Sequence, residues 1–190
     1  GLASAIDLAP TLLDIAGVDV SQIATRYPGL HGKSLRPALE TGQEVREGVL
    51  TAVESLMTLD GDYWSAMADP TAPARVASGE LRPDWRKRGF LRGYTDRRYT
   101  FGRYFSPLNP NRPKNVQALQ QQNDVVLYDR QSDPGETINL ATDPEHAALV
   151  EQYRQLLERL IDAEIGSDTH AWVPERPRLL GVPRWRGDAA

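Results

Sequence analysis

The chain has 190 residues, which is enough for one ordinary domain or for a small domain attached to the edge of a larger one. Hydrophobic residues make up 40% and charged residues 25%, values typical of a soluble globular protein, and the net charge of −4 argues against general polyanion binding. The absence of cysteine excludes a disulfide framework, a thiolate zinc site and a cysteine nucleophile. No apolar stretch has the length of a membrane span and no signal-peptide pattern is visible, so we expect no membrane partner and leave the compartment open.

The first predicted element is a short helix over residues 7–16. Asp7 is a typical N-cap residue, Pro10 lies in the first turn, where its missing N–H costs no helical bond, and Gly17 is a typical C′ residue. Apolar side chains occupy two adjoining faces of this helix: Leu8, Leu12 and Ile15 on one, and Ala9, Leu13 and Ala16 on the other. We therefore expect a mostly buried helix. Because the chain enters this pattern without an initiator Met, we interpret it as a piece of a longer protein.

The middle of the chain is predicted to contain strands. Residues 45–59 have a β-like pattern, whereas residues 66–83 are rich in Ala, Pro, Gly and Ser and are expected to form an exposed loop. Residues 89–95 and 98–105 are rich in β-formers and aromatics on either side of Asp96-Arg97, which indicates a hairpin.

The last third of the chain is predicted to contain another strand and a long helix. A polar connection holds a short helix near residues 116–121, and a strand follows at residues 125–128. Asp143-Pro144-Glu145 is a strong helix start. Four residues then repeat at helical spacing and are expected to be buried against the strands: Leu149, Tyr153, Leu156 and Leu160. Beyond Gly166 the chain is Pro- and Arg-rich, with Trp172 and Trp185 as possible docking points.

Three stretches combine into a pattern that is hard to obtain by chance. The first is Asp-x-x-Pro-Thr-Leu-Leu at residues 7–13, followed by Gly32-Lys33-Ser34-Leu35. The second is Arg-Arg-Tyr-Thr-Phe-Gly-Arg-Tyr-Phe at residues 97–105, and the third is Leu-Tyr-Asp-x-x-x-Asp-Pro-x-Glu-x-x-Asn-Leu at residues 127–140. In this order they resemble the C-terminal third of the sulfatase family, within the alkaline phosphatase superfamily, over roughly residues 4–165.

The resemblance implies a sulfate ester hydrolase whose catalytic residues lie elsewhere. Sulfatases use a formylglycine made from a Cys/Ser-x-Pro-x-Arg motif, a calcium ion held by Asp and Asn, and flanking Lys and His residues. In the family these motifs lie upstream of the first helix, so we expect no catalytic, cofactor-binding or metal-ligating residue here, and a missing N-terminal catalytic domain as partner. Calcium and formylglycine are implied for the parent enzyme alone. A phosphonate or phosphate ester hydrolase of the same superfamily is the nearest alternative.

Each motif also has an architectural interpretation, which we favour. Asp7 would cap a helix, residues 133–136 would make a turn, and Asn139 would supply side-chain hydrogen bonds before the next helix. Residues 71–75 match the pattern Thr-x-Pro-x-Arg, and relatives in the superfamily use Thr as nucleophile. This match follows the first predicted helix, whereas the family's nucleophile motif precedes it. We interpret it as a coincidence.

Basic residues between Arg82 and Arg103 are interleaved with aromatic ones, as in some nucleic-acid-binding surfaces. Because the whole chain is acidic, we favour a strand pair with basic residues facing solvent and aromatics facing a helix, and we expect no nucleic acid. A third interpretation is that some of these basic residues lie at the rim of the substrate pocket of the parent enzyme and face its sulfated substrate. The candidates for that rim are His31, Arg97, Arg98 and Arg103. A self-standing binding module without catalysis is the rival function, supported by these basic residues alone.

We therefore expect an α+β fold, with a small antiparallel sheet packed by a C-terminal helix at residues 144–165 and preceded by the tail of an α/β sulfatase catalytic domain. Residues 1–45 are assigned to the C-terminal edge of the catalytic domain, residues 46–165 to the sulfatase C-terminal subdomain and residues 166–190 to a tail. In the parent enzyme the subdomain would close one side of the active-site cleft and shape substrate choice.

Overall fold

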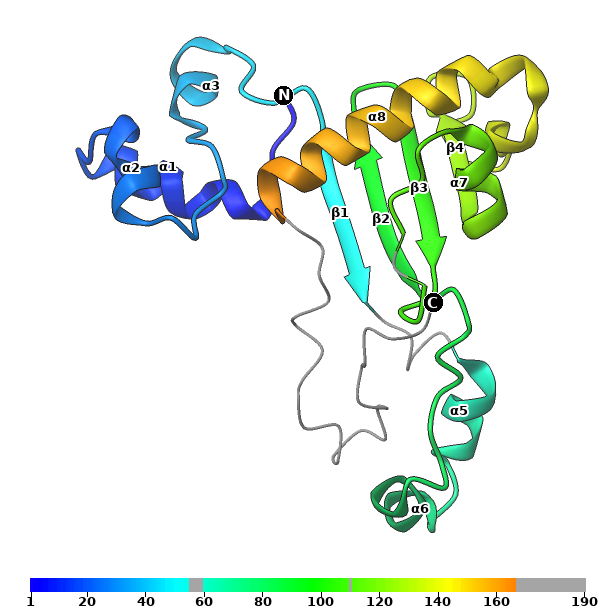
Figure 1. The fold of residues 1–190 in the computed structure, drawn as a ribbon. Helices are drawn as coiled ribbons and strands as arrows, with labels where there is room; N and C mark the ends of the chain where they lie inside the picture. The colour runs from blue at the N-terminus through cyan, green and yellow to red at the C-terminus, as the bar shows by residue number, and fades with distance from the viewer. Residues whose placement is uncertain (55–59, 110, 167–190) are drawn as a thin grey trace.

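A computed structural model describes residues 1–54, 60–109 and 111–166, and an open antiparallel sheet of four strands organises it (Figure 1). In chain order the strands are β1 (Val49–Glu54), β2 (Phe90–Thr95), β3 (Tyr99–Phe105) and β4 (Asp124–Asp129), and each pairs with the next. The expected hairpin is β2–β3, with Asp96 in its turn accepting hydrogen bonds from the backbone N–H groups of Arg98 and Tyr99. The predicted α+β fold class is confirmed.

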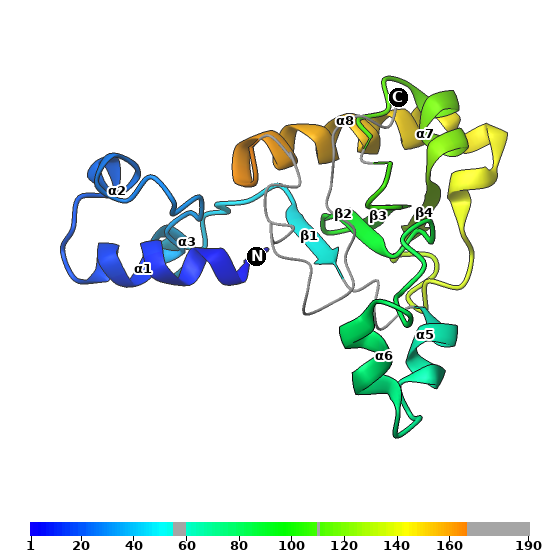
Figure 2. The same ribbon diagram turned by 60° about the horizontal axis from the view of Figure 1, so that its bottom comes forward.

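The long helix α8 (Ala147–Glu164) lies across one face of this sheet, as the two views in Figures 1 and 2 show. Alternate strand positions supply Tyr94, Phe101 and Leu127 to that face, because successive side chains of a strand point to opposite sides. The helix contributes Val150, Tyr153, Leu157 and Ile161, all almost completely buried. None of the described helices is both long and apolar enough to cross a membrane.

The buried stripe of α8 is displaced by one residue from the predicted one. Tyr153 is buried as expected, but Leu149, Leu156 and Leu160 are only half-buried. Both stripes have helical spacing, and they lie side by side on the helix, so the sequence pattern alone does not distinguish the stripe that meets the sheet from the one that flanks it. The Tyr153 hydroxyl also donates a hydrogen bond to Asp96, which ties the helix to the hairpin turn.

Short helices extend beyond the β1 edge of the sheet (Figure 1). They are the 3₁₀ turn η1 (Ala5–Asp7), α1 (Leu8–Ile15), α2 (Val20–Arg26) and α3 (Arg36–Thr41). The expectation of a mostly buried α1 is wrong for the described residues, since Leu8, Leu12 and Ile15 are between 57 and 66% exposed. The described neighbours cover only the side of the helix that carries Pro10 and Thr11.

Residues 60–88, which we call the arm, project from the end of the sheet where β1 ends and β2 begins (Figures 1 and 2). The arm contains α5 (Gly61–Ala66) and α6 (Ala72–Ser78), so the expected loop over residues 66–83 is wrong. Tyr63, Ala72 and Leu81 form a small core of their own. Helices of six or seven residues are too short to show a helical period, which is why the sequence pattern did not indicate them. Residues 55–59 of the predicted first strand lie outside the described residues.

Of the remaining elements, α7 (Val116–Gln122) matches the short helix predicted near residues 116–121. The predicted helix start at Asp143-Pro144-Glu145 forms the separate 3₁₀ turn η3 (Pro144–His146) ahead of α8, and the 3₁₀ turn η2 (Leu140–Thr142) was not predicted. The Asn139 side chain accepts hydrogen bonds from the N–H groups of Leu127 and Ala141 and donates one to the carbonyl of Val125, so it fastens the β4 edge to the next helical turn. Trp172 and Trp185 lie outside the described residues.

A buried ion network joins the start, the middle and the end of the described fold. Arg46 is about 3% exposed; it pairs with Asp7, with Nε lying 2.6 Å from Oδ2, and also with Glu164 at the end of α8. Asp7 stands at the N-cap position of α1, but its side chain makes no capping bond there, so the predicted capping role is wrong. The carboxylate accepts from the backbone N–H groups of Ser4 and Lys33 instead, because Arg46 and these donors converge on it.

Gly32 shows how closely the first loop packs beside this network. A Cβ atom at this position would lie 2.0 Å from the carbonyl oxygen of Ile6, so no other residue fits without a backbone shift. The Gly-Lys-Ser-Leu stretch of the resemblance therefore has an architectural role: it lets Lys33 approach Asp7 and places Ser34, whose hydroxyl donates to Asp14 at 2.6 Å.

Replacing Leu157 with alanine should lower the free energy of unfolding by roughly 2–5 kcal/mol, because this fully buried side chain would leave a cavity between α8 and the sheet. The matched control is Leu156→Ala on the same helix, where the half-buried side chain should cost clearly less. Urea unfolding followed by circular dichroism measures both. Equal losses would contradict the packing of this stripe.

Replacing Arg46 with alanine should lower the free energy of unfolding by about 3–5 kcal/mol, since it leaves two buried carboxylates without their cation. Arg97→Ala serves as the control, because Arg97 pairs with Glu44 on the surface and its loss should cost less than about 1 kcal/mol. Chemical denaturation of the two variants gives the comparison. A loss at Arg46 no larger than that at Arg97 would count against a buried network.

Candidate functional site

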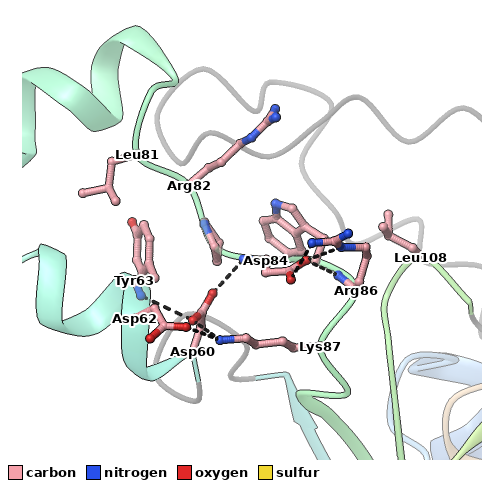
Figure 3. A pocket seen from close by; sticks show the side chains of 11 residues that line it. Asp60, Asp62, Tyr63, Leu81, Arg82, Asp84, Arg86, Lys87 and Leu108 are labelled. Atoms are coloured by element: carbon pink, nitrogen blue, oxygen red, sulfur yellow. Dashed lines mark hydrogen bonds and ion pairs between the residues drawn. The ribbon is translucent and has the colours of Figure 1, made fainter.

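The arm and the start of the loop after β3 enclose a groove of about 670 Å³ (Figure 3). It lies beside α5 and the segment that returns from α6 to β2. Its lining combines charged, aromatic and aliphatic side chains: Asp60, Asp62, Tyr63, Leu81, Arg82, Pro83, Asp84, Trp85, Arg86, Lys87 and Leu108. Its volume falls in the range of sites that take small molecules.

Asp60 fixes the floor of the groove. It caps α5 by accepting from the N–H of Tyr63 at 3.3 Å, and it also accepts from the N–H of Asp84 at 2.7 Å and from Lys87 Nζ at 2.6 Å. The hydrogen bond from Lys87, followed by that from Asp84, lowers the pKa of Asp60 to about 2. A charged carboxylate therefore holds the two sides of the groove together at neutral pH.

The charges around the groove are paired except at one position. Lys87 also contacts Asp62 at 3.1 Å, and Arg86 holds Asp84 through two hydrogen bonds of 2.9 and 3.0 Å. Arg82 is exposed and forms no hydrogen bond or ion pair with any residue that the structure describes; Figure 3 shows its guanidinium extended away from the paired carboxylates. The groove therefore presents one guanidinium whose donors are open to a ligand.

Trp85 supplies the aromatic part of the lining. It packs against Phe90 and Phe105, and its carbonyl accepts a hydrogen bond of 2.7 Å from the Ser106 hydroxyl. The indole Nε1 is buried and has no acceptor among the described residues. The ring thus packs on the Phe90–Phe105 pair, while its buried N–H has no hydrogen-bond partner among the described residues.

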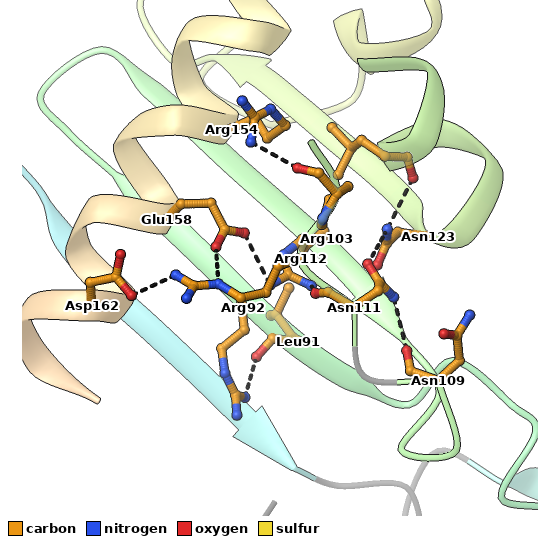
Figure 4. A network of polar contacts seen from close by, with 12 residues as sticks. Leu91, Arg92, Arg103, Asn109, Asn111, Arg112, Asn123, Arg154, Glu158 and Asp162 are labelled. Atoms are coloured by element: carbon orange, nitrogen blue, oxygen red, sulfur yellow. Dashed lines mark hydrogen bonds and ion pairs between the residues drawn. The ribbon is translucent and has the colours of Figure 1, made fainter. Parts of the chain in front are cut away.

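A second polar cluster joins the sheet to α8 (Figure 4). Arg103 and Arg112 converge on Glu158, at 3.3 and 2.9 Å, and Arg112 also reaches Asp162 at 2.5 Å. Arg103 further donates to the carbonyl of Asn111 at 2.9 Å. These bonds fasten the loop after β3 to the helix, so this cluster has an architectural role.

The four predicted rim residues do not share one site with the groove. His31 is exposed in the loop before α3, Arg97 pairs with Glu44, and Arg98 holds Asp129 with distances of 2.7–3.2 Å. Arg103 is only 2% exposed beneath α8. None of these four residues lines the groove.

The expectation that the basic residues of β2 and β3 face solvent is wrong for Arg92 and Arg103. Both are buried, and their guanidinium carbons lie 5.5 and 5.2 Å from the centre of the Phe105 ring. The sequence contained a signal for this, because each arginine shares the alternating positions of the aromatic residues that face α8. Their charge led to the opposite assignment.

The Thr-x-Pro-x-Arg match begins α6. Thr71 stands at the N-cap position of this helix, its hydroxyl donates to Asp69 at 2.7 Å, and Arg75 pairs with Glu80. These contacts form a turn and a helix start. Among the described residues no group of three His, Cys, Asp or Glu side chains is placed to hold a metal ion. The Cys/Ser-x-Pro-x-Arg motif does not occur in the sequence.

Asp60→Asn should destabilise the arm in a pH-dependent way. Since the pKa of Asp60 is about 2, below its ordinary value of 3.8, the charged carboxylate stabilises the fold above pH 4, and this contribution is lost as the pH falls towards 2. The difference in Tm between the wild type and the variant should therefore be large at pH 6 and small near pH 2.5 in calorimetry. Asp62→Asn, at an exposed side chain, should change Tm little. A difference independent of pH would contradict this role of Asp60.

Comparison with known proteins gives likeness at the level of structure. No protein-family model and no curated protein matches the chain. BT4656, solved with its substrate D-glucosamine-2-N,6-O-disulfate, aligns with a TM-score of 0.53 and 19% identity over 89% of this chain and 26% of its own. BT1596, a 2-O GAG sulfatase, aligns with a TM-score of 0.51 and 22% identity over 91% and 27%.

A third structure, from work on glycosaminoglycan metabolism by Bacteroides thetaiotaomicron, has a TM-score of 0.52 and 20% identity over 87% of this chain and 28% of its own. The chain thus spans about a quarter of the length of these proteins. At such identities the likeness concerns the fold. The chain has the α+β fold of the C-terminal region of sulfatases.

Proposed function

We propose that this chain is the C-terminal part of a sulfatase that hydrolyses sulfate esters, and that the nucleophile and the metal site belong to the rest of the parent protein. The observation that carries the proposal is the fold, which aligns with the three structures over 87–91% of the chain. The share of a quarter that it occupies in them supports a missing N-terminal catalytic domain as its partner.

The architectural roles of the motif residues support the same parentage. Asp7 joins the first loop to Arg46, Asp129 pairs with Arg98 of the β2–β3 turn, and Asn139 fastens the edge of β4. These contacts connect neighbouring secondary-structure elements. A protein with this fold therefore needs these side chains to satisfy the polar groups where the elements meet. The proposal accordingly assigns no catalytic residue to the described part of the chain.

The exposed apolar side of α1 supports a larger neighbour for residues 1–45. Ile6, Leu8, Leu12 and Ile15 are between 41 and 66% exposed and lie within ten consecutive residues. A cluster of large apolar side chains on one short segment is typical of an interface. We assign this face to the missing catalytic domain, at whose edge residues 1–45 would lie.

Two alternatives differ in chemistry. A phosphonate or phosphate ester hydrolase of the same superfamily would have the same fold and a different nucleophile, so the remainder of the parent chain decides between them. A non-catalytic binding module is favoured by one specific observation, the groove of the arm with its unpaired Arg82. The fold likeness favours the hydrolase.

The 190-residue chain should not turn over an aryl sulfate, whereas the longer parent chain should do so in the presence of calcium. The reason is that a positioned nucleophile, general acid or metal typically contributes orders of magnitude in rate. Release of the phenol, followed by absorbance, measures both proteins.

Three results would overturn the assignment in different ways. Turnover by the 190-residue chain that disappears in Thr71→Ala would identify Thr71 as a nucleophile. Turnover of an aryl phosphate or phosphonate, but not of the sulfate, by the parent would favour the alternative hydrolase. A parent that hydrolyses none of these esters would favour the binding module.

A further inference from the structure

We propose that a cavity between the start of β1 and the last turns of α8 binds a free α-amino acid with an aliphatic side chain. The cavity has a volume of about 470 Å³, which is in the range of small-molecule sites, and its lining comes mainly from residues 44–48 and from α8. Such a ligand needs a cation for its carboxylate, an anion for its ammonium group and an apolar surface for its side chain. The lining supplies all three, independently of the proposed hydrolase function.

Two opposite charges of the lining have no partner within the described part of the chain. Arg159 on α8 and Glu47 in the loop before β1 are both exposed, and neither forms a hydrogen bond or an ion pair with a described residue. Their charged groups therefore lie too far apart to pair with each other. An amino acid carries its carboxylate and its ammonium group on one carbon atom, so a single ligand can contact both side chains through charge-assisted hydrogen bonds.

The other charged side chains of the lining do not compete with such a ligand. Glu44 pairs with Arg97, and Arg46 belongs to the buried network with two carboxylates, so both already have partners. The side chain of Lys33 is exposed and has no ion-pair partner among the described residues, so it adds positive charge to the lining. This charge favours the carboxylate of the ligand, while Glu47 favours its ammonium group.

The Tyr94 hydroxyl is a third polar group in the wall of the cavity. Tyr94 is only 4% exposed, and its hydroxyl makes no hydrogen bond to a described residue. The hydroxyl end of the ring lies against Gly48, where any Cβ atom would overlap it. Burial, followed by the charges of Asp96 and Glu47, raises the pKa of Tyr94, while the charge of Arg159 lowers it, so the hydroxyl keeps its proton at neutral pH. A ligand carboxylate would accept this otherwise unused hydrogen bond.

The apolar surface consists of Val45, Leu156 and Leu160. Leu156 and Leu160 belong to the stripe of α8 that flanks the packed one, and all three side chains are half-buried in the lining of the cavity. Their position gives the second apolar stripe of α8 a role that packing on the sheet does not fulfil completely. A branched aliphatic side chain would cover their remaining apolar surface, which is favourable in proportion to the area removed from water.

The test is a titration of the isotope-labelled 190-residue chain, followed by NMR chemical shifts, with leucine, glycine, leucinamide and N-acetylleucine. Leucine should bind saturably, with a Kd of about 1 mM or tighter, and should shift the amide signals of residues 44–48 and 156–160. Glycine lacks the aliphatic side chain, leucinamide the carboxylate and N-acetylleucine the ammonium group, so each should bind at least about tenfold more weakly. The last two probes also represent the two ends of a peptide.

Three variants identify the groups that hold the ligand. Arg159→Gln should weaken leucine about tenfold without weakening leucinamide, which has no carboxylate, and Glu47→Gln should weaken leucine by a similar factor without weakening N-acetylleucine. Tyr94→Phe keeps the ring and should weaken leucine several-fold. The matched control is Arg26→Gln, at an exposed arginine outside the cavity that has no partner among the described residues, and it should leave the affinity for leucine within twofold.

Several outcomes would refute the site. These are no saturable binding of leucine, shifts confined to residues outside the cavity, glycine binding as tightly as leucine, or unchanged affinity for leucine in Arg159→Gln and Glu47→Gln. Leucinamide or N-acetylleucine binding as tightly as leucine would overturn the ligand class in favour of a peptide end. The proposed hydrolase function is tested separately, by turnover in the longer chain, so a failure of one does not imply a failure of the other.

Discussion

The packing of one stripe of α8 onto one face of the sheet is the interaction on which the rest of the structure depends. Val150, Tyr153, Leu157 and Ile161 bury the centre of the β2–β3 hairpin and the inner face of β4. A four-stranded sheet with nothing on either face would have no core, so the helix makes the sheet stable. The ring of Tyr153 meets Tyr94, Tyr99 and Phe101 at centroid distances of 5.3–6.3 Å.

Two buried arginines stand opposite each other within this packing. Arg92 and Arg103 are register partners on β2 and β3, an arrangement of like charges that is unfavourable by itself. It is stabilised because Glu54 pairs with Arg92 and Glu158 pairs with Arg103, while both guanidinium groups lie near the Phe105 ring. Glu54 of β1 and Glu158 of α8 thus each neutralise the positive charge of one arginine of the hairpin.

The sequence predicts the elements whose pattern extends over several repeats. The hairpin, β4 and the long helix belong to this group, because alternation or helical spacing is visible over their length. The burial of individual side chains is harder to predict from the sequence. The exposure of α1 depends on which elements lie next to it, and the buried stripe of α8 lies beside a second stripe of apolar residues. Arg92 and Arg103 were misassigned because residue type was given more weight than strand alternation.

The groove could not have been predicted from any local motif. Its lining comes from residues 60–63, 81–87 and 108, which only the fold of the arm and the loop after β3 brings together. The short helices α5 and α6 have no readable period, and Asp60 looks like an ordinary turn residue in the sequence. Its three hydrogen bonds, which organise the groove, come from residues up to 27 positions away.

Arg46 makes the two ends of the described fold depend on each other. It holds Asp7 at the start of α1 and Glu164 at the end of α8 with one guanidinium group. If the last turn of α8 frays, Arg46 loses one of its two carboxylates, and if the first loop lifts away, it loses the other and becomes accessible to water. Fraying at either end therefore weakens the other, so the two ends should exchange their amide hydrogens as one cooperative unit despite their separation along the chain.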